Sequence, residues 1–158
     1  MSKLSSAIAR QWQAPSTILD MAINARGEWA MISLGNGQLA VLTAADTGIG
    51  PQLLDAHSGI SLSICADAED HAFLSAGDDG RLLLIDPEVD VPTVLVDAGG
   101  KWIDHVATAK NGCRAYACGK SLHRLDEMGR PMTAPYDMPS VIGGIAFSPD
   151  VSRVAVSY

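Results

Sequence analysis

The sequence predicts an all-β fold built from a repeated, four-stranded antiparallel unit. Short apolar runs closed by a small residue recur at residues 30–33, 72–75, 114–117 and 153–157. The closing residues of successive runs are 42, 42 and 40 residues apart. Turns rich in glycine and aspartate separate these runs from further apolar runs. No apolar period typical of a helix persists beyond about two turns. Together these three observations favour short strands over helices.

The clearest copy of the unit spans residues 73–86, FLSAGDDGRLLLID. Its first strand is an apolar run closed by Ser75, and its second is the apolar run 82–85. Between them, residues 77–80 supply glycine and aspartate, which tolerate the positive φ angles that a tight hairpin needs. We therefore expect a β-hairpin at this place in the chain.

Each copy of the unit has the same neighbours along the chain. An alternating strand precedes the apolar run, at residues 18–24, 60–66, 102–108 and 142–147. A hairpin turn and a third strand follow it, with third strands at residues 39–42, 82–85 and 122–125. Weaker fourth strands are expected at residues 52–55, 93–97 and 132–136. Four strands per unit is the composition of a β-propeller blade, whose repeat is about 40–45 residues long.

The expected domain organisation follows from this repeat. An N-terminal segment, residues 1–15, precedes three blade-like units at 16–55, 56–97 and 98–136 and a partial unit at 137–158. A β-sandwich fits the composition but does not explain the repeated period. Residues 5–13 are expected to form either an outermost strand that closes a ring or a short helix.

The array of blades is expected to be open. Closed propellers have about 4–8 blades, and closure leaves few unpaired sheet edges. An array that stops partway through its fourth unit would expose two edges. We therefore expect either the N-terminal part of a longer, roughly seven-bladed chain or two copies that pair to close one ring. Self-association through the open edges is a related expectation.

The charge of the chain argues against several classes of function. The 158 residues carry a net charge of −7, and the basic residues are scattered singly, as Arg81, Lys101 and Arg114 illustrate. We interpret them as solubilising surface charge, and an acidic chain without a basic cluster is not expected to bind nucleic acid. No apolar stretch is long enough to span a membrane, and the N-terminus is not a typical secretory signal.

The three cysteines, Cys65, Cys113 and Cys118, form no paired framework and lack the spacing of a zinc site. Cys65 lies in an apolar run and is expected to be a small buried hydrophobic residue. Reduced thiols suit the cytoplasm, so we expect a cytoplasmic protein.

The second unit carries a recognisable set of residues. Ala56-His57 precedes its first strand, Ser75 closes its second strand, Asp79 lies in its hairpin turn, and Ile85-Asp86 ends its third strand. These residues resemble the Gly-His, serine, aspartate and Trp-Asp positions of the WD-repeat family of β-propellers. The resemblance covers residues 17–158 unevenly, so the chain looks like a degenerate member or a member of a neighbouring seven-bladed family.

In the WD-repeat family the histidine, serine, aspartate and tryptophan form a hydrogen-bonded network within each blade. The resemblance therefore implies a structural network of His57, Ser75 and Asp79 here. It would end at those three residues, because Ile85 has no indole donor. The other units lack the full set of residues and are expected to have no such network.

Two other interpretations of these polar residues are weaker. His57, Ser75 and Asp79 have the composition of a Ser/His/Asp triad, but the sequence contains no nucleophile elbow. The acidic turn at residues 77–80 lacks the alternating acids and distal glutamate of a calcium loop. A structural network and a hairpin turn explain these residues better.

The remaining histidines give little evidence for a metal site. Asp104-His105 and His123 lie on predicted strands of the third unit and could meet, but two histidines alone are weak evidence. His71 begins a strand and is expected to be exposed. We therefore expect no metal and no cofactor.

The candidate binding residues lie in loops at one end of the predicted blades. In a propeller, the loops that join successive blades emerge on one rim together with the hairpin turns. That rim would carry Lys101 and Trp102, with Ser58 and Tyr136 nearby. An aromatic side chain beside a cation is a plausible binding hot spot. The alternative is that Trp102 is a core residue at the start of a strand.

The function expected from the sequence is a non-catalytic scaffold that binds a protein or peptide on this rim. The alternative is an enzymatic propeller, a metal-dependent lactonase or a quinone-dependent enzyme, with its site at the central channel. Asn36, His57 and Asp79 are the candidate residues for that alternative. A third expectation is a purely structural pairing of two half-propellers.

Overall fold

The computed structural model describes residues 11–45, 50–68 and 71–158. In this part of the chain the protein has 14 strands in four antiparallel sheets, so the predicted all-β class is confirmed. The strands are β1 (Ile18–Ile23), β2 (Trp29–Leu34), β3 (Gln38–Thr43), β4 (Gln52–Asp55), β5 (Ser61–Ala66), β6 (Phe73–Gly77), β7 (Arg81–Ile85), β8 (Thr93–Asp97), β9 (His105–Thr108), β10 (Arg114–Cys118), β11 (Ser121–Leu125), β12 (Tyr136–Asp137), β13 (Gly144–Phe147) and β14 (Val154–Ser157).

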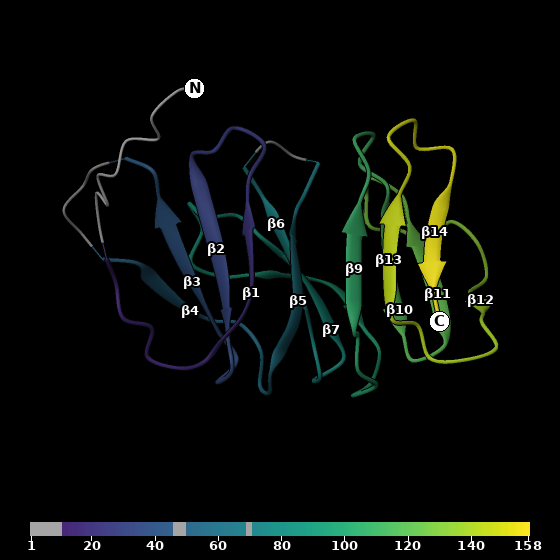
Figure 1. The fold of residues 1–158 in the computed structure, drawn as a ribbon, viewed down its shortest axis with the longest axis horizontal. Coiled ribbons are helices and arrows are strands. Elements are labelled where there is room, and N and C mark those ends of the chain that lie inside the picture. The colour runs from purple at the N-terminus through teal and green to yellow at the C-terminus, as the bar shows by residue number, and fades with distance from the viewer. Residues whose placement is uncertain (1–10, 46–49, 69–70) are drawn as a thin grey trace, which may run out of the picture.

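Each sheet is a meander of strands that follow one another along the chain. The first sheet is β1–β4, the second β5–β8 and the third β9–β12, while the fourth has the two strands β13 and β14. The first strands of the sheets, β1, β5, β9 and β13, lie side by side on one side of the molecule (Figure 1). The four sheets therefore succeed one another along the molecule in chain order.

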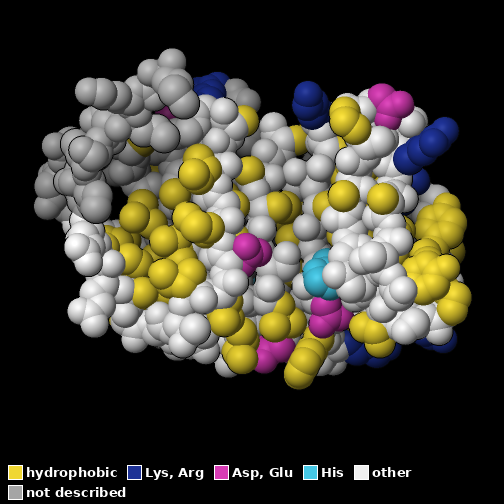
Figure 2. All heavy atoms as spheres, in the orientation of Figure 1, with side chains coloured by type: hydrophobic (Ala, Val, Ile, Leu, Met, Phe, Trp, Pro, Cys, Tyr) yellow, Lys and Arg dark blue, Asp and Glu magenta, His cyan; other side chains and the backbone are white. Residues whose placement is uncertain are grey.

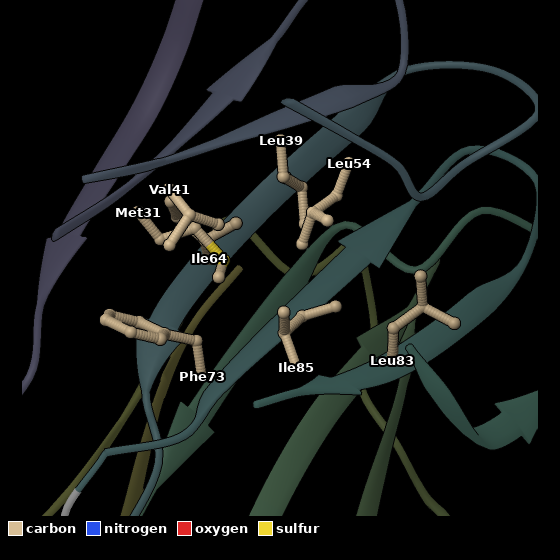
Figure 3. Packing of buried hydrophobic residues seen from close by; sticks show 8 residues of the cluster. All are labelled: Met31, Leu39, Val41, Leu54, Ile64, Phe73, Leu83 and Ile85. Carbon is tan, nitrogen blue, oxygen red and sulfur yellow. The ribbon is translucent and has the colours of Figure 1, made fainter. Parts of the chain in front are cut away.

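The hydrophobic core lies between successive sheets. Met31, Leu39, Val41 and Leu54 of the first sheet pack against Ile64, Phe73, Leu83 and Ile85 of the second (Figure 3). The opposite face of the second sheet packs on the third through Leu74 and Tyr116, among others. The third sheet in turn packs on the fourth. Both faces of the second and third sheets are thus covered, which explains their nearly continuous apolar runs.

The expected alignment of the repeats at Ser33 and Ser75 is wrong by one residue. Met31, two residues before Ser33, faces the following sheet, whereas Phe73, two residues before Ser75, faces the preceding one. Alternate residues of a strand share a face, so Ser33 and Ser75 point in opposite directions. Strand pairing gives the correct offset: a bulge between Ile18 and Asp20 recurs between Ser61 and Ser63, 43 residues later. The residue equivalent to Ser75 in the first sheet is therefore Ile32.

Most strand bounds shift by one or two residues, and two strands differ from expectation by more. The strand expected at residues 102–108 begins only at His105, and the fourth strand expected at 132–136 is the short pair Tyr136–Asp137. Pro135 accounts for part of the second difference, because it has no amide hydrogen to donate to a neighbouring strand, while Pro131 forms an isolated bridge with Leu125. The expectation for residues 5–13 falls largely outside the described residues. Of that segment, Trp12 packs against the first sheet.

Candidate functional site

The structure brings His57, Ser75 and Asp79 together. Nδ1 of His57 lies 2.9 Å from Oδ1 of Asp79, and Nε2 lies 2.9 Å from Oγ of Ser75. A carboxylate can only accept hydrogen bonds, so Nδ1 of His57 donates to Asp79. Ser61, which was not predicted from the sequence, adds a further hydrogen bond to this row, because its Oγ lies 2.9 Å from that of Ser75.

This geometry resembles a Ser/His/Asp triad, but the serine is fully buried. Both Ser75 and Ser61 are 0% exposed, and the side chain of His57 is equally buried. A nucleophilic oxygen must reach the substrate, and the oxygen of Ser75 is covered by the packed sheets. The network therefore ties the loop before β5 to β6 and to the following hairpin turn, which is a structural role.

The hairpin turn uses its acidic side chains as hydrogen-bond acceptors. Asp79 accepts from the amides of Ser58 and Arg81 as well as from His57, and Asp78 accepts from the amide of Ile60 at 2.7 Å. Burial alone would raise the pKa of Asp79, but the hydrogen bond from His57 and those from the amides outweigh it and hold that pKa below its usual value. Both carboxylates thus stabilise the contact between the turn and the preceding loop.

Within the described part of the chain the histidine network occurs once, and a repeated backbone hydrogen bond shows why. The amide of His57 donates to the carbonyl of Gly37 in the turn of the preceding sheet, at 3.0 Å. At the next two junctions Ala98 donates to Gly80 and Met138 donates to Lys120, each at 2.8 Å. The position of the histidine is therefore held by alanine and methionine in the later loops, and neither side chain can bridge a serine and an aspartate.

A second candidate site is an open groove at the end of the third sheet where the hairpin turns lie. Its volume is about 470 Å³, and its lining residues are Lys101, Trp102, Asp104, Cys118, Gly119 and Val141. Trp102 is 59% exposed and Val141 63% exposed, so the alternative of a core tryptophan is wrong. Lys101 and Trp102 were predicted from the sequence, but the other lining residues were not, because they come from three separate segments of the chain.

The polar groups of the groove have different surroundings. The carboxylate of Asp104 accepts a hydrogen bond from the amide of Gly119 at 3.2 Å, which holds it against the turn. Burial raises the pKa of the Cys118 thiol, so this cysteine stays protonated and weakly nucleophilic at neutral pH. Within the described residues the ammonium group of Lys101 forms no ion pair. The groove can therefore offer a cation beside an apolar surface.

The other two predicted rim residues lie outside this groove. Ser58 is exposed, and its amide donates to Asp79 at 3.1 Å, on the junction between the first two sheets. Tyr136 is 49% exposed and pairs with Leu122 at the outer edge of the third sheet. Of the four predicted rim residues, only Lys101 and Trp102 therefore line the groove.

The remaining histidines and cysteines are distributed singly. His123 stacks on Tyr116 with ring centroids 4.5 Å apart, and burial lowers its pKa. His71 is exposed near Asp86. Cys65 packs between the second and third sheets, where burial raises the pKa of its thiol to about 12. Among the described residues, no group of three histidine, cysteine or acidic side chains is placed to bind a metal.

The interpretation of the basic residues as surface charge is wrong for Arg114. Its side chain is 2% exposed and makes two hydrogen bonds to the buried carboxylate of Asp67, at 3.0 and 2.6 Å. A third hydrogen bond, 2.9 Å long, reaches the carbonyl of Glu127. Arg114 lies on β10 of the third sheet and Asp67 directly follows β5 of the second, so the pair joins two sheets. Their separation by 47 residues left no local signal in the sequence.

No family model matches the sequence, and no curated protein matches it. The described residues also include no helix long and apolar enough to cross a membrane.

Proposed function

We propose that the chain is a non-catalytic interaction module of the WD-repeat propeller type, which binds a protein or peptide in the groove beside Trp102. The observation that carries the proposal is a tryptophan left 59% exposed in the lining of a groove. Tryptophan is enriched among the residues that dominate binding energy, and covering its ring removes a large apolar area from water. The succession of meander sheets, with their turns gathered at one end, supports the propeller assignment.

The groove also suggests the chemistry of the ligand. Trp102 and Val141 offer apolar surface, and Lys101, whose charge acts on the Cys118 thiol, lines the same groove. A segment with a large apolar side chain next to an acidic one satisfies both features. Its carboxylate would pair with Lys101 while its apolar side chain covers the indole.

The proposal can be tested with peptides selected from a displayed random library on the purified chain. We expect the selected peptides to pair an aromatic or aliphatic residue with an acid. Trp102→Ala should weaken their binding by roughly 30-fold, the equivalent of a hot-spot loss of about 2 kcal/mol. Lys101→Glu should weaken it as well, and more strongly at low salt.

A matched control comes from Met128, which is 70% exposed in the turn at the opposite end of β11. Met128→Ala should leave the dissociation constant, measured by calorimetry, unchanged. If no peptide is selected, or if Trp102→Ala and Met128→Ala bind the selected peptides equally well, the groove is not the binding site.

A further inference from the structure

The first sheet has an apolar face that points away from the second sheet. Two cross-strand rows define this face, which we call the head face. The rows are Met21–Ile32–Ala40–Leu53 and Ile23–Ala30–Leu42. Met21 is 58% exposed, Ile23 59% and Leu53 43%. Figure 2 shows hydrophobic side chains gathered over this end of the molecule.

Part of the head face is covered by a segment of the same chain. Trp12 and Ala14 pack against Ile32 and Ala40, in the middle of the first row. Ile32 and Ala40 are buried, whereas Met21 at the β1 end of that row is exposed. The exposed part of the head face is therefore concentrated on β1, the first strand of its sheet.

The equivalent positions on the first three strands of the second sheet are covered, whereas Val94 on its outer strand is exposed like Leu53. Its equivalent row is Ile64–Ser75–Leu83–Val94, and the bulge before Met21 recurs before Ile64. Ile64 is 6% exposed and Leu83 2% exposed, because the first sheet packs on them. Met21 is at the position in the first sheet that corresponds to Ile64 in the second, but no sheet in the described part of the chain packs on Met21. The head face thus has the composition of a sheet-packing surface.

The fourth sheet presents the opposite kind of face at the other end of the molecule. Ile145, Phe147, Val154 and Val156 pack toward the third sheet, so the alternate residues point outward. These are the paired residues Ala146 and Ala155 with Gly144 and Ser157, which we call the tail face. Ala146 and Ala155 are exposed and small. In the third sheet, the face that points the same way along the molecule is buried by the sheet that follows, as at Ala115.

We propose that the tail face of one copy of this chain packs on the head face of a second copy. The contact would continue the sheet-on-sheet packing that already joins the four sheets in order. The protruding side chains of Met21 and Ile23 would fill the space left by the small residues of the tail face. Each copy carries both faces, and we expect the contact to close after two copies into a two-fold dimer rather than to continue as a filament.

The charge of the chain predicts how this dimer responds to salt. Each copy carries a net charge of −7, so two copies repel each other at low ionic strength. Burial of apolar side chains opposes that repulsion and does not depend on screening. The dimer should therefore become tighter as salt is added.

The test is sedimentation of the full 158-residue chain and of two single variants, across low micromolar to millimolar concentration. The wild-type chain should sediment as a dimer. Met21→Asp disables the head face and Ala155→Arg the tail face, and each should weaken dimerisation by at least about tenfold. Val91→Asp, at a residue 75% exposed outside both faces, is the control and should dimerise as the wild type does.

Mixing the variants separates head-to-tail packing from other arrangements. An equimolar mixture of Met21→Asp and Ala155→Arg keeps one intact head–tail pair and places aspartate against arginine in the other, so a heterodimer should form. Far-ultraviolet circular dichroism checks that each variant is folded. A monomeric wild type, a dimer insensitive to Ala155→Arg, or a mixture that stays monomeric would each overturn the proposal.

Discussion

At the scale of single residues, the chain relies on a few buried polar contacts. The row from Asp79 through His57 and Ser75 to Ser61 is closed to solvent at its serine end, and every link is a hydrogen bond. Buried polar groups are costly unless they are paired, so these contacts make one arrangement of loop and strand more favourable than its alternatives. The triad-like geometry therefore serves the fold.

Asp79→Asn should destabilise the protein in a pH-dependent way. The pKa of Asp79 in the folded chain lies below its usual value of 3.8, so the ionised carboxylate stabilises the fold above that pH. This contribution is lost as the pH falls through the lower, folded-state pKa. At neutral pH we expect the variant to be about 1–3 kcal/mol less stable, with a difference that shrinks on acidification.

Urea unfolding followed by circular dichroism at several pH values measures this difference. Glu88→Gln, which removes an exposed carboxylate, is the control and should change the free energy of unfolding little at any pH. A penalty for Asp79→Asn that stays constant from neutral to acid pH would contradict the linkage between this carboxylate and the fold.

At the scale of elements, the junctions between sheets are built from hairpin turns that touch the next loop. The carbonyl of Gly37 accepts from the amide of His57, and the same contact recurs at Gly80 and Lys120. Gly37 has a φ of +83°, and a Cβ atom there would clash with the carbonyl oxygens of Gly59 and His57. The absence of a side chain is therefore what lets this turn and loop approach each other.

Gly37→Ala should be far more destabilising than Gly27→Ala. Both glycines have positive φ angles, but a Cβ atom at Gly27 would meet nothing within 4 Å. Gly27→Ala should therefore cost only the backbone strain, about 1 kcal/mol. Gly37→Ala adds a steric clash with backbone and should cost at least about 2 kcal/mol more. Equal losses in urea unfolding would show that the close approach at Gly37 is not important for stability.

At the scale of the whole molecule, packing is uneven along the row of sheets. The second and third sheets are covered on both faces, whereas the head and tail faces have exposed residues. The ion pair of Arg114 and Asp67 also joins the two inner sheets. Local stability follows the amount of buried apolar contact, so it should be highest in the middle of the molecule and lowest at the fourth sheet.

Hydrogen exchange followed by mass spectrometry should reveal this gradient. We expect the amides of β6 and β10 to exchange most slowly, and those of β13 and β14 to exchange first. Measurement at low protein concentration keeps any self-association from protecting the fourth sheet. Uniform protection across all four sheets would contradict the gradient and indicate a single cooperative unit.

The sequence by itself determined where the strands and turns lie. Alternating apolar residues and glycine-rich turns act locally, so all 14 strands found in the described residues were expected, and two of them, β4 and β8, with their observed bounds. The resemblance to the WD-repeat positions predicted His57, Ser75 and Asp79 of the buried network but not Ser61. Tertiary structure decided the rest. A shift of one residue reverses the face of a strand, so only pairing between strands fixed that Ser75 corresponds to Ile32. Likewise, the groove at Trp102 and the burial of Arg114 depend on segments far apart in the chain, and the local sequence carries no record of which segments meet.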